Sequence, residues 1–125
     1  MTPAELDDLE KLIAEELHYF DSDEQRQAFR SRRIPLRLVV QDWGYSDAVH
    51  DCYVIAEDER QQIVYCRSGF GPSFPWSSQR RGAADLGMDA DWCAYLYESF
   101  VTSSLWPGER PEDLELMGPG ERERK

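Results

Sequence analysis

The sequence predicts an α+β fold with two N-terminal helices, an antiparallel meander sheet of three or four strands, and a C-terminal helix packed on one face of that sheet. Three observations support this fold class. Apolar residues near the N-terminus recur at helical spacing, those in the middle alternate with polar ones, and short turns rather than helical crossovers join the expected strands. The 125 residues are expected to form one domain over 1–106, followed by a flexible charged tail over 107–125.

The first helix is expected to begin at Pro3. Thr2 and Glu5 form a capping box around a proline at the first helical position, which makes Thr2 the N-cap. The apolar stripe that follows has helical spacing and consists of Leu6, Leu9, Leu12, Ile13, Leu17 and Phe20.

A second cap at Ser22, with Gln25 three residues later, opens a shorter helix. It is expected to end near Arg33, because Pro35 disfavours helical backbone at Ile34.

The middle of the chain changes to strand periodicity. In the segment 36–41, one set of alternate positions is entirely apolar, and this pattern predicts a half-buried strand. The apolar set is Leu36, Leu38 and Val40, and the other set is Arg37, Val39 and Gln41.

Next comes a hairpin of Val49–Glu57 and Gln61–Arg67 around a three-residue loop. In that register the opposed pairs are Glu57 with Gln61, Ile55 with Ile63, Tyr53 with Tyr65, Val54 with Val64, and Cys52 with Cys66. Both faces are apolar, so the hairpin is expected to lie centrally in the sheet.

A short strand is expected around Trp76–Arg80, before a turn at Arg81 and Gly82. A third helix is then predicted from an N-cap at Asp89, with Met88 and Cys93 as a hydrophobic staple, ending before Trp106. Its buried positions would be Trp92, Tyr95, Leu96, Phe100 and Val101. One further helical turn is expected within the tail, at Glu112–Met117.

Net charge restricts the function more than any motif does. Lys and Arg number 14 against 25 Asp and Glu, a formal charge of −11, which repels nucleic-acid phosphates and anionic lipid and attracts basic proteins. No run of 18 apolar residues is present, and the N-terminus lacks the pattern of a secretion signal. An odd, widely spaced set of three cysteines fits a reducing compartment, so a cytoplasmic location is expected.

A metal or nucleophilic site could be built from His50, Cys52, Cys66 and Cys93. Zinc sites usually present paired ligands on a tight turn, and this sequence has none. The cysteines are therefore expected to fill the core. The protein is expected to be no enzyme and to hold no metal or other cofactor, with chemistry at Cys52 or Cys66 and His50 as an alternative.

Acidic and aromatic residues predict a surface that binds a protein partner. Acids surround the turn before the hairpin and form the hairpin tip, and aromatics occupy that first turn and the proline-stiffened segment after the hairpin. The candidate residues are Asp42, Trp43, Tyr45, Asp47, Asp51, Glu57, Asp58, Glu59, Phe70, Phe74 and Trp76. The alternative for Phe70–Trp76 is a loop that folds its aromatics back over the core.

The functional hypothesis is a small acidic cytoplasmic protein that neutralises a basic partner, such as a bacterial immunity protein or antitoxin that inhibits a nuclease-type toxin. One alternative is a nucleic-acid mimic, such as a phage anti-defence inhibitor, which would use Glu10, Glu15 and Glu16 on the first helix. Another is a regulatory subunit that binds through exposed aromatics. Neither direct nucleic-acid binding nor membrane binding is expected.

Overall fold

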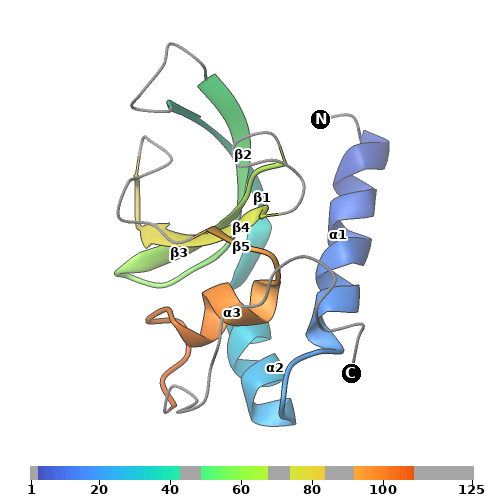
Figure 1. Cartoon of the computed structure of the whole chain (residues 1–125), viewed down its shortest axis with the longest axis vertical. Coiled ribbons are helices and arrows are strands. Elements are labelled where there is room, and N and C mark those ends of the chain that lie inside the picture. Colours follow the sequence, from blue (N-terminus) through green and yellow to red (C-terminus); the bar gives the residue numbers. More distant parts are fainter. Residues whose placement is uncertain (1–2, 43–48, 68–73, 84–91, 109–125) are drawn as a thin grey trace.

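The structure, a computed structural model, describes residues 3–42, 49–67, 74–83 and 92–108. It confirms the α+β class, with a five-stranded antiparallel sheet in the order β1-β2-β3-β4-β5, whereas the sequence predicts three or four strands. The elements are α1 Pro3–Leu17, α2 Asp23–Ser31, β1 Arg33–Asp42, β2 Val49–Glu57, β3 Gln61–Tyr65, β4 Trp76–Arg80, β5 Trp92–Cys93 and α3 Leu96–Val101 (Figure 1). No helix in these ranges has the length and apolar character needed to span a bilayer.

Local capping places the two N-terminal helices where the sequence predicts them. Helix α1 begins at Pro3, while its expected cap, Thr2, lies outside the described residues. Ser22 caps α2 by accepting a hydrogen bond from the Gln25 backbone N–H at 3.2 Å. In return, Gln25 Oε1 accepts one from the Asp21 N–H at 2.8 Å, one residue earlier than in the standard capping box.

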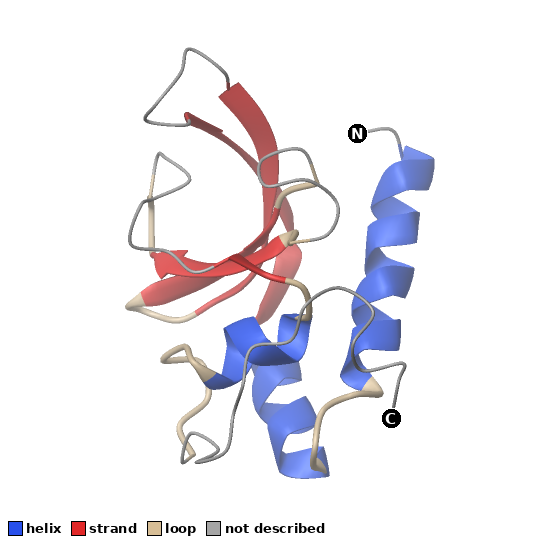
Figure 2. Ribbon diagram, viewed as in Figure 1, coloured by secondary structure: helices blue, strands red, loops and turns tan. Residues whose placement is uncertain are grey.

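The three helices gather on one side of the curved sheet (Figure 2) and enclose the main apolar core against it. Tyr53, Tyr65 and Trp76 oppose one another across β2, β3 and β4, on the sheet face that meets the helices. The aromatic rings of Phe20 and Phe100 stack at 5.2 Å between their centroids. These contacts fix the helices against the sheet.

Strand β1 departs from the burial that its alternation predicts. Leu36 packs against the core, but Leu38 and Val40 are 51% and 54% exposed, while Gln41 is fully buried. Alternation identifies two strand faces without showing how far along the strand other elements cover them. Leu38 opposes Tyr53, so Leu38 and Val40 lie on the helix-facing side of β1 together with Leu36. The apolar side of the predicted half-buried strand is buried only near Leu36, because the helices do not cover Leu38 and Val40.

The central hairpin follows the predicted register only at its open end. Tyr53 opposes Tyr65 and Val54 opposes Val64, as expected, but a β-bulge at Ile55 shifts the register toward the tip. Ala56 therefore opposes Ile63, and Glu57 opposes Gln62. The predicted pairs of Ile55 with Ile63 and Glu57 with Gln61 are wrong.

The opposite sheet face is concave, and buried amides connect its distant strands. Gln41 in β1 and Gln79 in β4 exchange amide hydrogen bonds of 2.8 and 3.1 Å. Three strand spacings in a flat sheet would separate these strands by about 14 Å, so the sheet must curl to bring them together. Cys52 and Cys66 form a second, smaller buried cluster.

The third helix begins later than the sequence predicts. Trp92 and Cys93 form strand β5, paired with Ser77 and Trp76, and α3 starts at Leu96. Edge pairing to β4 competes with helix formation there, and the side-chain pattern alone does not reveal it. The expected cap Asp89, the staple residue Met88 and the tail helix over 112–117 lie outside the described residues. Strand β4 and the turn at Gly82, which has a φ of +80°, are confirmed.

Candidate functional site

The acids at the hairpin tip are engaged within the protein. Glu57 forms ion pairs with Arg37 at 2.9 Å and Arg81 at 3.5 Å, and its side chain is only 14% exposed. The hydrogen bond from Arg37 lowers the pKa of Glu57, with further help from both positive charges against the opposing effect of burial. Glu57 thus stabilises the sheet beside arginines instead of offering a free carboxylate.

Asp58 holds the turn itself and is 8% exposed. Its Oδ1 accepts hydrogen bonds from the N–H groups of Arg60 at 2.7 Å and Gln61 at 2.8 Å, and its Oδ2 accepts one from Ser104 Oγ at 2.7 Å. Burial works against the charged form, but these three hydrogen bonds and the charge of Arg32 outweigh it and lower the pKa of Asp58. Asp58 is a structural residue.

The predicted acids lie in two separate places. Asp51 and Glu57 stand at opposite ends of β2, six residues apart, which is about 20 Å along a strand. Asp42 and Asp51 lie at one end, and Glu57, Asp58 and exposed Glu59 at the other. A partner-binding surface at one end of β2 would therefore not include the acids at the opposite end.

The candidate aromatics also divide. Trp76 is 1% exposed and contacts Tyr65, with ring centroids 4.9 Å apart, so it belongs to the core as a residue of strand β4. Phe74 is 36% exposed. Four further candidates, Trp43, Tyr45, Asp47 and Phe70, lie outside the described residues.

Two predicted acids adjoin two exposed apolar residues of the strand that the sequence predicts to be half-buried. Leu38, Val40 and Asp42 alternate along one face of β1, and Asp51 lies directly opposite Val40 on β2. We call these four residues the β1–β2 surface, and all four are exposed. None of the ion pairs in the described part of the chain involves Asp42 or Asp51. The exposed carboxylates of Asp42 and Asp51 can therefore meet a cationic partner.

The acidic start of α1 borders this surface. Tyr53, which opposes Leu38, has its pKa raised by burial and then by the negative charges of Asp51 and Glu5. Carboxylates from a strand and from a helix therefore act on the same hydroxyl. Helix α1 extends the negative field of the β1–β2 surface.

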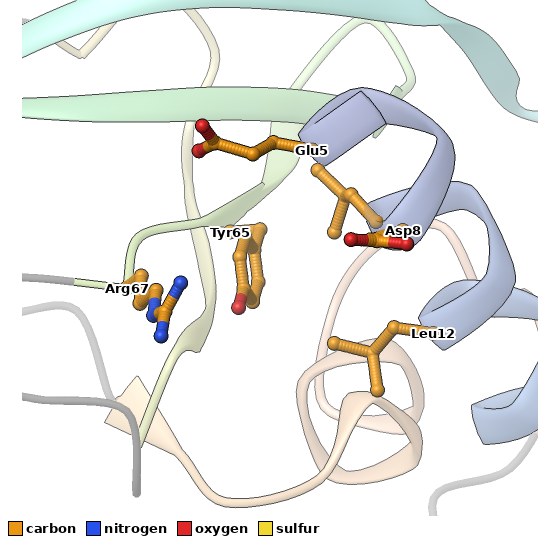
Figure 3. Close-up of a pocket in the computed structure, with 6 residues that line it drawn as sticks. Glu5, Asp8, Leu12, Tyr65 and Arg67 are labelled. Atoms are coloured by element: carbon orange, nitrogen blue, oxygen red, sulfur yellow. The ribbon is translucent and has the colours of Figure 1, made fainter. Parts of the chain in front are cut away.

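A pocket of about 130 Å³ lies between α1 and β3 (Figure 3). Its lining combines carboxylates, aliphatic side chains, a tyrosine and an arginine: Glu5, Asp8, Leu9, Leu12, Tyr65 and Arg67. The lining therefore carries two acidic groups and one basic group around an apolar floor. Sequence reasoning missed this pocket, although Glu5 and Asp8, three residues apart on α1, share a helix side with Leu12.

Cys52 and Cys66 lie on the concave face, whereas Cys93 opposes Trp76 on the face that meets the helices. Cys52 and Cys66 are fully buried, and Cys93 is 4% exposed. A hydrogen bond with Cys66 and burial raise the pKa of the Cys52 thiol far above its ordinary value. Within the described ranges, no group of three His, Cys, Asp or Glu residues is arranged to hold a metal ion. The geometry suits packing, because a thiol held neutral is a poor nucleophile.

Alkylation should detect this protection. We expect iodoacetamide at neutral pH to modify Cys52 at least roughly a thousandfold more slowly in the folded protein than in urea, because reaction requires opening of the sheet. Peptide mass spectrometry, with Cys52→Ser identifying the site, measures the rate. Fast labelling of Cys52 in the folded protein would instead support the alternative in which Cys52 acts as a nucleophile.

Comparison with known proteins gives one partial likeness. Residues of this chain are 27% identical over 82 positions to a probable secreted beta-glucosidase of Schizosaccharomyces pombe, covering 62% of this chain and 25% of that protein. The chain thus spans about a quarter of the length of the curated relative it matches. No family model matches the chain, and no solved structure matches it.

Proposed function

We propose that this protein is a small acidic binding protein that neutralises a basic protein partner in the cytoplasm. The nearest functional type is a bacterial immunity protein or antitoxin that inhibits a nuclease-type toxin. The β1–β2 surface carries the proposal, because it joins exposed carboxylates to exposed apolar side chains on paired strands. Such a surface combines electrostatic steering with an apolar contact area.

Charge supports this class of partner. The formal charge of −11 raises the rate at which a cationic protein arrives. At the point of contact, Asp42 and Asp51 can pair with its lysines or arginines while Leu38 and Val40 exclude water.

The nucleic-acid mimic receives less support from the positions of its acids. Glu10 forms two hydrogen bonds with the Arg33 guanidinium, at 2.8 and 3.1 Å. Glu16 is 4% exposed and accepts a hydrogen bond from the Leu96 N–H at the start of α3. Of the three acids assigned to that function, Glu15 alone remains exposed without such a role.

Affinity capture from host lysate, followed by charge reversal, tests the proposal. We expect a basic protein to bind at low salt and to dissociate as salt rises. Asp42→Lys with Asp51→Lys should then weaken its binding roughly ten- to a hundredfold by titration calorimetry, because two attractive contacts become repulsive.

A matched control makes the same charge change elsewhere. Glu15→Lys with Glu24→Lys alters two exposed acids, near the C-terminal end of α1 and in α2, and should reduce affinity severalfold at most. Equal loss in both double variants would mean that net charge alone drives binding. No loss in the Asp42 and Asp51 variant would reject the β1–β2 surface.

A further inference from the structure

We infer that the partner docks by adding an extended basic segment to the free edge of β1, so that the sheet gains a strand. This inference rests on the proposed function and names how its surface recognises the partner. The segment would place apolar side chains against Leu38 and Val40 and a lysine or arginine against Asp42. Main-chain hydrogen bonds would supply affinity, and the side chains would supply selectivity.

The position of β1 in the sheet provides the hydrogen-bonding edge. In the described part of the chain β1 pairs with β2 alone, at the end of the strand order. In an antiparallel pair, every second residue directs its N–H and C=O toward the neighbouring strand, and the residues between direct theirs away. The other groups along Arg37–Asp42 therefore form a row that an incoming strand can use.

Among the described residues, neither a proline nor a bulge shields this edge where Leu38 and Val40 stand. Natural edges are commonly shielded by proline, bulges, short length or charge. In β1 the proline, Pro35, and the register shift both fall between Arg33 and Arg37. From Arg37 to Asp42 the register is regular, and Leu38 and Val40 there are more than half exposed. The first half of β1 is therefore shielded by Pro35 and the register shift, and the half from Arg37 to Asp42 has neither.

The side chains on the open half specify the chemistry of the segment. Leu38, Val40 and Asp42 follow one another on one face, with Asp51 beside Val40. An added strand therefore matches them with two apolar residues followed by a basic one at alternate positions. A second copy of this chain fits poorly, because it would bring another formal charge of −11 to the same edge.

A synthetic peptide tests strand addition without knowledge of the natural partner. The probe is a blocked heptapeptide, Lys-Thr-Lys-Thr-Val-Thr-Val, used with its reversed sequence because the strand direction is open. The control replaces the central threonine and the valine after it by proline, which keeps the charge and removes an N–H donor from each side of the peptide, so that strand pairing is prevented whichever side faces β1. NMR titration of the full chain follows the amides of β1 and their hydrogen exchange. At saturation we expect alternate amides of Arg37–Asp42 to exchange at least tenfold more slowly, and the proline peptide to leave them unchanged.

Variants separate this inference from the proposed function. Leu38→Lys with Val40→Lys should weaken peptide binding at least tenfold and preserve the folded spectrum, because both side chains are exposed. Tyr19→Lys, at a residue that is 51% exposed outside the sheet, should leave binding unchanged.

If both basic peptides shift Asp42 and Asp51 equally without protecting alternate β1 amides, strand addition is wrong and an acidic binding surface survives. If no resonance of the β1–β2 surface responds to either basic peptide, strand addition is also wrong. The proposed function then depends on the capture experiment, and failure to recover a salt-sensitive basic protein there would reject it separately.

Discussion

Replacing Phe100 by alanine is expected to lower the free energy of unfolding by about 3–5 kcal/mol. Phe100 is fully buried in α3 and contacts the rings of Phe20, Phe29 and Trp106, at centroid separations of 5.2, 5.7 and 5.9 Å. Alanine would leave a cavity where the helices meet. Urea denaturation followed by tryptophan fluorescence measures the loss.

Leu38→Ala is the matched control, because it also truncates an apolar residue. We expect a loss below about 1 kcal/mol, since Leu38 is 51% exposed. A loss of about 2–5 kcal/mol at Leu38 is the value for a buried leucine, and would contradict the surface position on which the docking edge depends. A loss below about 1 kcal/mol in Phe100→Ala would contradict the central position of that ring.

Replacing Asp58 by alanine is expected to cost about 2–3 kcal/mol at neutral pH, because hydrogen bonds to a charged acceptor are strong and three donors lose theirs. The donors are Arg60, Gln61 and Ser104, which join the hairpin turn to the segment after α3. Thermal and urea unfolding measure the loss. Asp23→Ala, which removes a carboxylate whose side chain is 94% exposed, should change stability by less than about 1 kcal/mol.

The same carboxylate gives stability a definite pH dependence. Folding lowers the pKa of Asp58, so its contribution is complete above the unfolded value of about 4 and is lost as pH falls through the folded value. Glu57 acts in the same direction. Asp58→Asn should therefore show a shallower decline in unfolding free energy than wild type below about pH 5. Parallel declines would mean that Asp58 has the same pKa in both states.

Local signals predict the start of each N-terminal helix because their causes lie within a few residues. The side chain of Ser22 reaches the N–H of Gln25, and Pro3 fits the first turn of α1 without any distant contact. The position of β4 is likewise predicted. The start of α3 is not, because Trp92 and Cys93 pair with a strand that is distant in sequence.

The candidate surface likewise combines features with local causes and features that depend on distant contacts. The sequence shows which residues are acidic, but it led us to group Asp51 with Asp58, whose carboxylate is enclosed by its own turn. The predicted half-buried strand did not show that Leu38 and Val40 are exposed. Their exposure depends on where the helices end over the sheet, and that is a property of packing.

The sequence by itself determined the α+β class, the N-terminal helix starts, the open end of the central hairpin and the acidic character of the molecule. Each of these features follows from the chemistry of single residues, from the spacing of apolar residues, or from contacts between residues that are close in the sequence. Tertiary structure alone decided how far along β1 the helices cover the sheet, which carboxylates pair with arginines or hold turns, and that Gln41 meets Gln79 across a curled sheet. These depend on contacts between distant residues, where burial and charge pairing outweigh local preference.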